Sequence, residues 1–485
     1  MLDFKKTLRY FLLMLVLIIS SQLFAQLSVS PVFSNNMVLQ RNKPVVIWGE
    51  EKPGATVSVS FDTQKKSTVT DENGVWKIWL KPLQVSTINK ELTISASTTL
   101  VFTNVLVGDV WLCSGQSNME YPLDRVSKKF KAGNKGVDEG LVEMENKNRL
   151  PIIRYLYVER NLKKQPELPS TGWINGSDSS VRLVSAIGYF FAKEIAEKTG
   201  IPIGIISSSW GGTRIEPWIP DWAYKLSPVF KDSAQTPDFK IDGVHPGQMF
   251  NAMIKPMLPL AIKGILWYQG ESDLTIHDQA TYPAKFSLLA NTWRGLFNDK
   301  KIPLYYVQIA PHLYTKRKDA LQHTAKALPE FWEAQTSSLS IKNTGMVVTT
   351  DLVPDLSDIH PPYKWIVAHR LVNLAMAKIY GEKQTEFSGP KYASMKINKG
   401  SISLSFTHAK SGLSIKDSTE LSWFSIAGAD GNFVPASAKI TGKKIIVSAP
   451  SVIAPTQVRF GWDETAQPNL FNKAGLPAIP FRTNQ

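Results

Sequence analysis

The chain has 485 residues, of which 43% are hydrophobic and 20% are charged. This length predicts two or three domains, and the composition is typical of a soluble globular protein, so collagen-like, coiled-coil and mainly disordered chains are excluded. The formal net charge is +14, but the lysines are scattered and form no basic stripe alternating with aromatic residues. We therefore predict a solvated surface and no nucleic-acid partner.

The first 25 residues have the pattern of a secretory signal peptide. Lys5, Lys6 and Arg9 precede an apolar run over residues 10–19, and the small residue Ala25 follows at a suitable cleavage point. The run is shorter than the roughly 20 residues that span a bilayer, although an uncleaved anchor is the alternative. Cys113 is the single cysteine of the chain, so an intrachain disulfide is excluded. We expect a periplasmic or secreted bacterial protein with no membrane partner after signal cleavage.

Residues 26–104 form the first folded region, and they predict a small β-sandwich. Short apolar–polar alternations are separated by turn signals such as Lys52-Pro53-Gly54. The clearest alternating runs cover residues 56–61, 75–80 and 92–94.

Residues 105–385 change to an alternation of strands and helices. The predicted strands cover residues 105–112, 203–206, 262–267, 304–309 and 346–350. Helical periodicity covers residues 182–199, 249–258, 279–297, 320–337 and 363–380, and Gly200 is the predicted cap of the first of these helices. This alternation predicts a parallel sheet with helices on both faces.

Residues 386–485 return to short alternating strands, most clearly over residues 401–406, 443–447 and 457–462. This second β region follows the α/β core in the sequence, as the first one precedes it. We expect that it packs with the N-terminal β region into one unit or stands separately; the sequence leaves both open.

Two loops after predicted strands carry residues for nucleophilic catalysis. Ser117 follows Gly115 in a tight turn, which would lift its hydroxyl to the carboxyl edge of the sheet, where α/β sheets place their ligands. The turn lacks the second glycine of the G-x-S-x-G elbow. The loop after the last strand contains His360 among three aspartates, and a histidine with a carboxylate is the base that a serine nucleophile requires. A metal loop is the alternative for this segment.

Four ordered segments resemble the sialate O-acetylesterase family of SGNH hydrolases. The matching segments are residues 115–120, 211–218, 267–273 and 358–361. The resemblance implies a flavodoxin-like, doubly wound parallel sheet flanked by β-sandwich regions. It also implies hydrolysis of acetyl esters on sugars without a metal or another cofactor.

The resemblance assigns roles to the residues at matching positions. Ser117 would be the nucleophile and His360 the base. The backbone N–H groups of Ser117 and Gly212 and the side-chain amide of Gln269 would form the oxyanion hole. Gln116, Asn118 and Glu271 would contact these residues without touching the substrate. Glu271 would accept hydrogen bonds from the N–H groups of the turn or pair with Arg214.

Three further residues are weaker candidates for substrate binding. Trp267 and Tyr268 precede Gln269. Their rings would either form the floor of a sugar-binding site or lie buried at the end of a strand. Arg214 would either grip the carboxylate of a sialic acid or hold the local structure. A general-acid role for Glu271 would instead make the protein a glycosidase, but Ser117 and His360 would then have no purpose.

The acid partner of His360 departs from the usual SGNH spacing, because Ser357 stands where an aspartate three residues before the histidine is common. We favour Asp358, which is nearest in the chain, over Asp355 and Asp351, and a Ser–His dyad is a further alternative. A carboxylate partner predicts a raised pKa for His360 and a matching acid limb in the rate profile.

The sequence therefore predicts a secreted carbohydrate O-acetylesterase, most simply a sialate O-acetylesterase, whose partner is an O-acetylated saccharide. A deacetylase of xylan, xyloglucan or pectin is the closest alternative. A carbohydrate-binding protein with a decayed site is the non-enzymatic one, and the polar segment 127–148 argues against a lipid esterase with an apolar lid. The acetylated sugar and the oligomeric state stay open.

Overall fold

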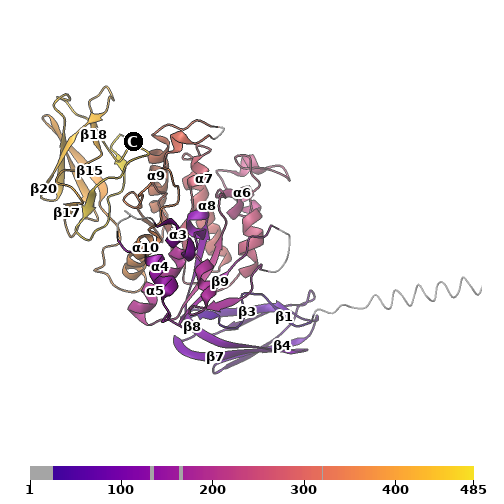
Figure 1. The fold of residues 1–485 in the computed structure, drawn as a ribbon. Coiled ribbons are helices and arrows are strands. Elements are labelled where there is room, and N and C mark those ends of the chain that lie inside the picture. The colour runs from indigo at the N-terminus through magenta and orange to yellow at the C-terminus, as the bar shows by residue number, and fades with distance from the viewer. Residues whose placement is uncertain (1–25, 131–135, 163–167, 319–320, 485) are drawn as a thin grey trace, which may run out of the picture.

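A computed structural model describes residues 26–130, 136–162, 168–318 and 321–484. The predicted signal peptide, residues 1–25, lies outside the described residues. The molecule consists of an N-terminal β region, a central α/β body and a C-terminal β region, in that order along its length (Figure 1). None of the helices in the described ranges is long and apolar enough to cross a membrane.

The central body is built on a mainly parallel sheet in the order β10-β9-β11-β8-β12-β13-β14. Only β10 at one edge runs antiparallel to its neighbour. The strands are β8 (Thr99–Gly115), β9 (Ile153–Tyr157), β10 (Trp173–Asn175), β11 (Ile203–Ser209), β12 (Gly264–Tyr268), β13 (Leu304–Val307) and β14 (Thr344–Val347). The α/β prediction is confirmed, and β9 and β10 are strands that the sequence analysis did not predict.

Helices pack in two pairs around this sheet: α5 contacts α10, and α8 contacts α9. The four are α5 (Ala186–Thr199), α8 (Tyr282–Leu296), α9 (Ala327–Ser337) and α10 (Lys364–Lys378). The helix predicted from residue 182 begins at Ala186, because the Ser185 hydroxyl accepts from the Gly188 N–H and caps it. Gly200 ends this helix in the left-handed conformation, as predicted. The helix predicted over residues 249–258 is a π turn followed by a 3-10 turn.

Shorter helices fill the connections. They are α2 (Ser117–Glu120), α3 (Leu123–Lys129), α4 (Glu139–Glu145), α6 (Asp221–Leu226) and α7 (Glu271–Leu274). Single turns of 3-10 or π helix are η1 (Ser179–Leu183), η2 (Glu216–Trp218), η3 (Lys231–Ala234), η4 (Phe250–Ile254), η5 (Lys255–Met257), η6 (Tyr314–Lys316) and η7 (Ser338–Ser340).

The long strand β8 belongs to both the N-terminal region and the central body. Its first half pairs with β7 (Ser86–Ser95), and its second half pairs in parallel with β11 and β12. Alternate residues are exposed up to Asn104, and every residue from Val105 onward is buried. The change of pattern at residue 105 therefore marks the entry of one strand into the core rather than a break between two elements.

The N-terminal region packs tightly on the central body and shares its hydrophobic core. One sheet contains β1 (Ser28–Val29), β3 (Val45–Glu50) and β6 (Val75–Leu80). The other strands of this region belong to the same sheet as β8. They are β2 (Val38–Gln40), β4 (Thr56–Phe61), β5 (Gln64–Val69) and β7. The side chain of Arg41 is paired with buried Asp109 at 2.9 Å, which fixes the two parts together.

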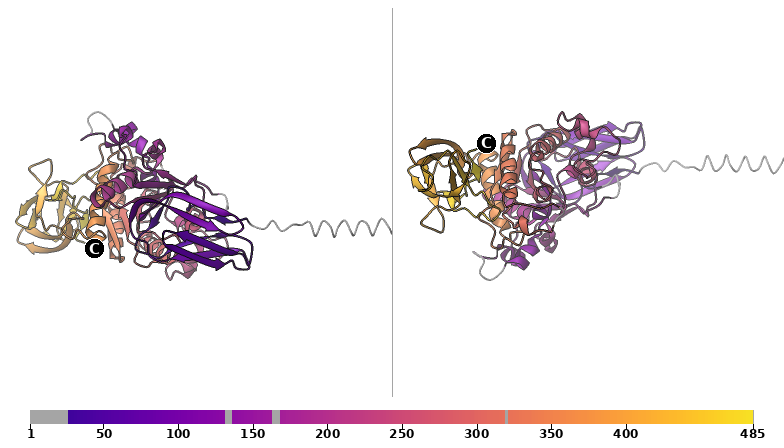
Figure 2. Two further views of the ribbon diagram at one scale, coloured as in Figure 1. Left: turned by 90° about the horizontal axis from the view of Figure 1, so that it is seen from below. Right: turned by 90° about the horizontal axis from the view of Figure 1, so that it is seen from above.

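The C-terminal region has a hydrophobic core of its own. Its strands are β15 (Lys391–Asn398), β16 (Ser401–Thr407), β17 (Leu413–Ile415), β18 (Phe424–Ala427), β19 (Val434–Pro435), β20 (Ser437–Thr441), β21 (Lys444–Ser448), β22 (Gln457–Phe460), β23 (Leu470–Asn472) and β24 (Phe481–Arg482). It lies at the opposite end of the molecule from the N-terminal strands in every view (Figures 1 and 2). The two β regions therefore stand separately, which is one of the two arrangements that the sequence left open.

Candidate active site

Three strands end level with one another at the carboxyl edge of the central sheet. Gly115 at the end of β8 is aligned with Ser209 of β11 and with Tyr268 of β12. The loops that follow these strands therefore start side by side, although they are about 95 and 150 residues from Ser117 in the chain. The parallel register explains why the matching segments meet at one place.

The turn carrying Ser117 depends on glycine at position 115. Gly115 has φ of +133°, and a Cβ there would lie 2.2 Å from the backbone oxygen of Tyr268. The next residue, Gln116, donates its N–H to this same oxygen at 2.9 Å. The strand thus ends against β12, and Ser117 begins the short helix α2 with its hydroxyl partly exposed.

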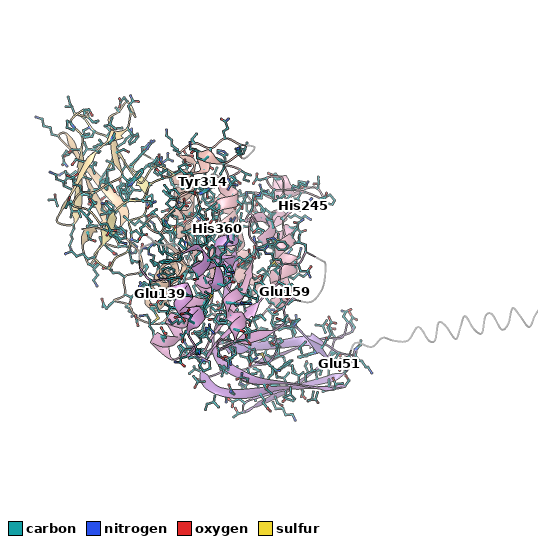
Figure 3. The ribbon with its side chains drawn as sticks, viewed as in Figure 1. Glu51, Glu139, Glu159, His245, Tyr314 and His360 are labelled. Carbon is teal, nitrogen blue, oxygen red and sulfur yellow. The ribbon has the colours of Figure 1, made fainter. Side chains whose placement is uncertain are left out.

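His360 lies against Ser117, near the middle of the molecule (Figure 3). The Ser117 Oγ and the His360 Nε2 are 2.9 Å apart, which is hydrogen-bond distance between a nucleophile and its base. On the other side of the ring, the His360 Nδ1 is 3.5 Å from the Asp358 Oδ1. Asp358 also accepts the backbone N–H of His360 at 3.0 Å and pairs with Lys129 at 3.0 Å.

The other two aspartates of this loop have different partners. Asp355 is exposed and accepts from the backbone and hydroxyl of Ser357, which is a local turn. Asp351 forms a two-point ion pair with Arg370 of α10, at 2.7 and 2.8 Å. Among the three candidates, Asp358 is therefore the one that the structure places beside the imidazole.

The pKa of His360 is lowered from its ordinary value to about 4, the reverse of the direction that the sequence predicted. Burial of the ring is the largest cause, and the positive charges of Lys364 and Arg125 add to it. Asp358 acts in the opposite direction but is outweighed. The Asp358 carboxyl itself is pulled two ways: burial raises its pKa, but hydrogen bonds from Lys129 and the His360 N–H bring it below its usual value.

The turn after β11 lies directly against the serine. A Cβ on Gly211 would be 3.2 Å from the Ser117 Cβ, and the Gly211 N–H donates to the Glu120 Oε2 at 2.8 Å. Gly212 follows with φ of +76°, a left-handed conformation that favours glycine. Among the described residues, the backbone N–H groups of Ser117 and Gly212 donate to no protein acceptor. Within the described ranges, neither predicted backbone donor is therefore committed to another protein group.

Gln269 does not offer its amide to this space. Its side chain is fully buried, and its Nε2 donates to Asp273, to the backbone oxygen of Thr213 and to the Gln116 Oε1. Gln116 in turn accepts from the N–H groups of Gly270 and Ser272. These two glutamines tie the ends of β8 and β12 together, so the expected oxyanion role of Gln269 is corrected to a structural one.

Trp267 and Tyr268 are also buried, with 1% and 0% of their surface exposed. The ring of Trp267 packs edge-on between Trp218 and Trp293. Neither residue is able to floor a sugar site, and the reading of this segment as a buried strand end is correct.

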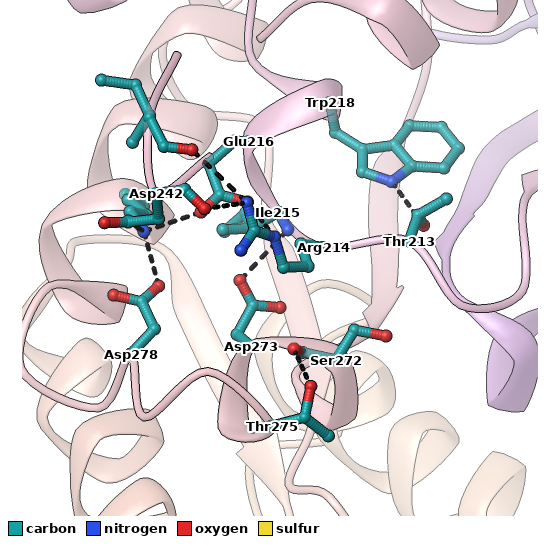
Figure 4. Close-up of polar contacts among 12 residues, drawn as sticks. Thr213, Arg214, Ile215, Glu216, Trp218, Asp242, Ser272, Asp273, Thr275 and Asp278 are labelled. Carbon is teal, nitrogen blue, oxygen red and sulfur yellow. Dashed lines mark hydrogen bonds and ion pairs between the residues drawn. The ribbon is translucent and has the colours of Figure 1, made fainter. Parts of the chain in front are cut away.

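The side chain of Arg214 lies in a cluster of charged residues with Glu216, Asp242, Asp273 and Asp278 (Figure 4). Its guanidinium donates to the backbone oxygen of Asp242 at 2.9 Å and lies 3.4 Å from Glu216. It is therefore placed to hold the local structure rather than to bind a substrate carboxylate. Glu271 pairs with Asn118 instead of Arg214, at 2.5 Å.

Buried acids in the same cluster have a spacing at which a metal ion would fit. Oxygens of Glu216, Asp273 and Asp278 lie within 4.8 Å of one another. The ammonium of buried Lys285 donates to Glu216 at 2.8 Å and to Asp278 at 2.6 Å, and it also pairs with Asp242. Lys285 thus supplies the positive charge that these acids require.

Sequence reasoning missed three charged residues around the serine and histidine. Lys129 pairs with Asp358, Glu120 holds the Gly211 turn, and Lys364 is buried beneath the site. Glu120 is three residues after Ser117, and Lys364 is four residues after His360. Ser117 and Glu120 share the helix α2, where a spacing of three residues places side chains on the same side. His360 precedes α10, so no helical spacing relates it to Lys364.

Comparisons with known proteins identify the family of this chain. The profile of a family described as "Carbohydrate esterase, sialic acid-specific acetylesterase" matches residues 107–364, more than half of the chain. The sialate O-acetylesterase of Homo sapiens is 28% identical over 92% of this chain and 91% of its own. That of Mus musculus is 28% identical over 77% of each chain.

A solved structure extends the similarity to the whole fold. A carbohydrate acetylesterase from Xanthomonas citri superposes with a TM-score of 0.82 and is 32% identical. The match covers 94% of this chain and 99% of that one, so it includes both β regions. The chain is therefore a carboxylic-ester hydrolase that belongs to the sialic acid-specific acetylesterase family of carbohydrate esterases.

Proposed function

We propose that this enzyme removes acetyl groups from O-acetylated sugars, with O-acetylated sialic acid as its substrate, through an acetyl-serine intermediate. The observation that carries the proposal is the 2.9 Å contact between the Ser117 Oγ and the His360 Nε2 at the carboxyl edge of the sheet. The family match and the names of the curated relatives support the acetyl ester and the sugar.

The reaction would proceed in two acyl-transfer steps. The Ser117 oxygen attacks the acetyl carbonyl while its proton passes to the His360 Nε2. The carbon–oxygen bond to the sugar then breaks, and the sugar leaves as an alcohol with the proton from His360. A water molecule, deprotonated by His360, attacks the acetyl-serine, and acetate leaves as the serine regains its proton. Asp358 would stabilise the imidazolium through Nδ1, over the distance of 3.5 Å.

The negative charge on the carbonyl oxygen would be stabilised by two backbone donors. The N–H groups of Ser117 and Gly212 lie on adjoining turns, and the Gly211 turn is held in place by Glu120. Rigid donors of this kind cost no reorganisation when the charge develops. Because Gln269 is fully engaged elsewhere, the proposed oxyanion hole consists of these two donors.

The serine mechanism is tested with Ser117→Ala and p-nitrophenyl acetate. We expect a folded protein with unchanged melting temperature and a loss of turnover of at least about 10³-fold. Mass spectrometry of the wild type after rapid acid quenching should show an adduct of one acetyl group on the peptide containing Ser117. Retention of more than a few per cent of turnover by the variant, or an adduct on Ser209 or Ser272, contradicts the mechanism.

The substrate is tested by acetate release from a panel of acetylated sugars. We expect O-acetylated sialic acid to give the highest kcat/KM. The Xanthomonas citri relative is described only as a carbohydrate acetylesterase, so acetylated xylan, xyloglucan and pectin form the second arm of the panel. A clear preference for one of these glycans would make the enzyme a cell-wall deacetylase with the same serine chemistry.

The fold and the location of the enzyme complete the proposal. The order of the parallel strands β11-β8-β12-β13-β14 matches the flavodoxin-like order expected of an SGNH hydrolase, with β9 and β10 added at one edge.

Residues 1–25 would direct export, which places the enzyme in the periplasm or outside a bacterial cell. Sequencing of the exported protein should give Gln26 as its first residue, and retention of Met1 contradicts cleavage.

A further inference from the structure

Three buried polar side chains meet beneath the serine and histidine without touching the acyl group in the proposed reaction. Asn118 follows Ser117 in α2, Glu271 begins α7, and Lys364 begins α10. Their exposed fractions are 0%, 2% and 0%. Burial of a charge in this way is costly unless it is paired, so the arrangement of the three needs an explanation.

The chemistry of the neighbours fixes the orientation of the Asn118 amide. Lys364 has only donors, and its ammonium donates to the Asn118 Oδ1. The Glu271 carboxyl accepts from the Asn118 Nδ2 at 2.5 Å. Burial raises the pKa of Glu271, whereas the hydrogen bond from Asn118 and the charge of Lys364 favour its ionised form, which has only acceptors. If the amide were flipped, its Nδ2 donor would face the Lys364 ammonium, and its Oδ1 acceptor would face the Glu271 carboxylate. The lysine and the glutamate together therefore permit one orientation.

In that orientation the amide connects the two halves of the site. The Asn118 Nδ2 also donates to the backbone oxygen of Ile359 at 3.1 Å. Asn118 is the residue after Ser117, and Ile359 is the residue before His360. The bond thus joins the serine turn to the histidine loop one residue away from each reacting group.

We propose that Lys364, acting through Asn118, is a positioning residue that holds Ser117 and His360 at their working distance and keeps the imidazole neutral. The inference rests on the proposed serine mechanism and adds to it a residue outside the acyl-transfer steps. Misplacement of a reacting group by about 1 Å is sufficient to cost about 100-fold in rate.

The second half of the proposal follows from the charges that face Lys364. Glu271 from α7 and Asp358 from the histidine loop are its acidic neighbours, and Arg125 from α3 is a basic one. The rings of Tyr121 and Tyr268 lie 4.7 and 5.5 Å from the ammonium, which favours the cation. Burial nevertheless lowers the pKa of Lys364 to about 7. While charged, Lys364 disfavours a second positive charge on His360.

The test compares Lys364→Met, the double variant Lys364→Met/Glu271→Gln and a matched control, Lys285→Met. Methionine is unbranched and only one atom shorter than lysine, but it lacks the charge and the donors. The single variant leaves Glu271 as an unpaired buried acid, and the double variant removes that acid too. Lys285 is equally buried, but it belongs to the cluster around Glu216, so its loss controls for removal of a buried lysine.

For the double variant we expect a melting temperature close to that of the wild type and a kcat lowered about 10–100-fold, with KM changed less than 3-fold. Its acid limb should move to higher pH by about one unit, because the cation that disfavours protonated His360 is gone. Lys285→Met should lower the melting temperature and leave the acid limb in place. Unchanged kcat and an unmoved acid limb in the double variant would overturn the proposal.

A readout without turnover separates this inference from the esterase proposal. The ring of His360 is titrated by NMR in proteins labelled at histidine, with His360→Gln used for assignment. We expect the pKa of His360 to rise in the double variant whether or not acetyl esters are the substrate. An unmoved pKa refutes the role of Lys364, whereas an inactive wild type with a raised pKa in the variant refutes only the esterase proposal.

Discussion

Replacement of Asp358 by asparagine measures how much the carboxylate contributes to the proposed reaction. The carboxylate would stabilise the imidazolium that forms as Ser117 attacks. A hydrogen bond to a charged group contributes about 1.5–3 kcal/mol. The 3.5 Å separation is at the long end for such a bond, and Asp358 divides its charge between His360 and Lys129.

We therefore expect a loss at the lower end of that range, about 1.5–2 kcal/mol, which corresponds to about 10–30-fold in kcat at 1.36 kcal/mol per tenfold change. This is less than the roughly 10⁴-fold loss that removal of a closely bonded triad carboxylate causes. The difference arises because Asp358 is 28% exposed, so water replaces part of the lost interaction.

The assay is hydrolysis of p-nitrophenyl acetate at saturating substrate, with Asp355→Asn as the matched control from the same loop. Asp355 accepts from Ser357 in an exposed turn, so its variant should keep kcat within about 3-fold. Asp351→Asn should instead lower the melting temperature, because it breaks the ion pair with Arg370. A silent Asp358 variant, or an equal loss in the Asp355 variant, would show that another group orients the imidazole.

Three other predictions follow from the site. The acid limb of kcat/KM should lie near pH 4, because a neutral His360 is required and its pKa is lowered; a limb at pH 6.5 or above in a pH 3.5–8 series would contradict this. Gln269→Ala should lower the melting temperature, because buried Asp273 keeps the Ile215 N–H but loses the amide that donates to its Oδ2, yet it should reduce kcat less than about 10-fold; a loss of about 10²–10³-fold at unchanged stability would return Gln269 to the oxyanion hole. Arg214→Ala should leave KM for O-acetylated sialic acid unchanged while stability falls, and a selective rise in that KM would identify Arg214 as the carboxylate-binding group.

The meeting of Ser117 and His360 was predictable because each follows a strand of a parallel sheet. Residues at such positions share one edge of the sheet, whatever their separation in the chain. Strand β9 was harder to predict, because its five residues include Arg154 and lie between two polar segments. A short run with a charged residue has little periodicity from which a strand can be recognised.

The sequence left the roles of Trp267 and Tyr268 open and misplaced the Gln269 amide, and one physical cause explains all three. A strand that ends at a functional edge places some side chains towards the solvent and others towards the neighbouring layer, and packing decides between them. Here Trp218 and Trp293 cover Trp267, and Asp273 takes the Gln269 amide. The direction of the His360 pKa likewise depends on burial and on Lys364 and Arg125, which a local sequence pattern does not reveal.

The continuity of β8 has a consequence for how this enzyme family can be recombined. At about 3.3 Å per residue, the 17 residues Thr99–Gly115 form one continuous strand, with an extended length of about 55 Å, that runs from the N-terminal sheet to the nucleophile turn. A fusion of two relatives at residue 105 would divide this strand and leave an unpaired strand edge, which is prone to aggregation. The C-terminal β region has its own core and begins after α10, so it is the part better suited to exchange between relatives, provided that contacts to the central body such as the Arg482–Glu333 ion pair are kept.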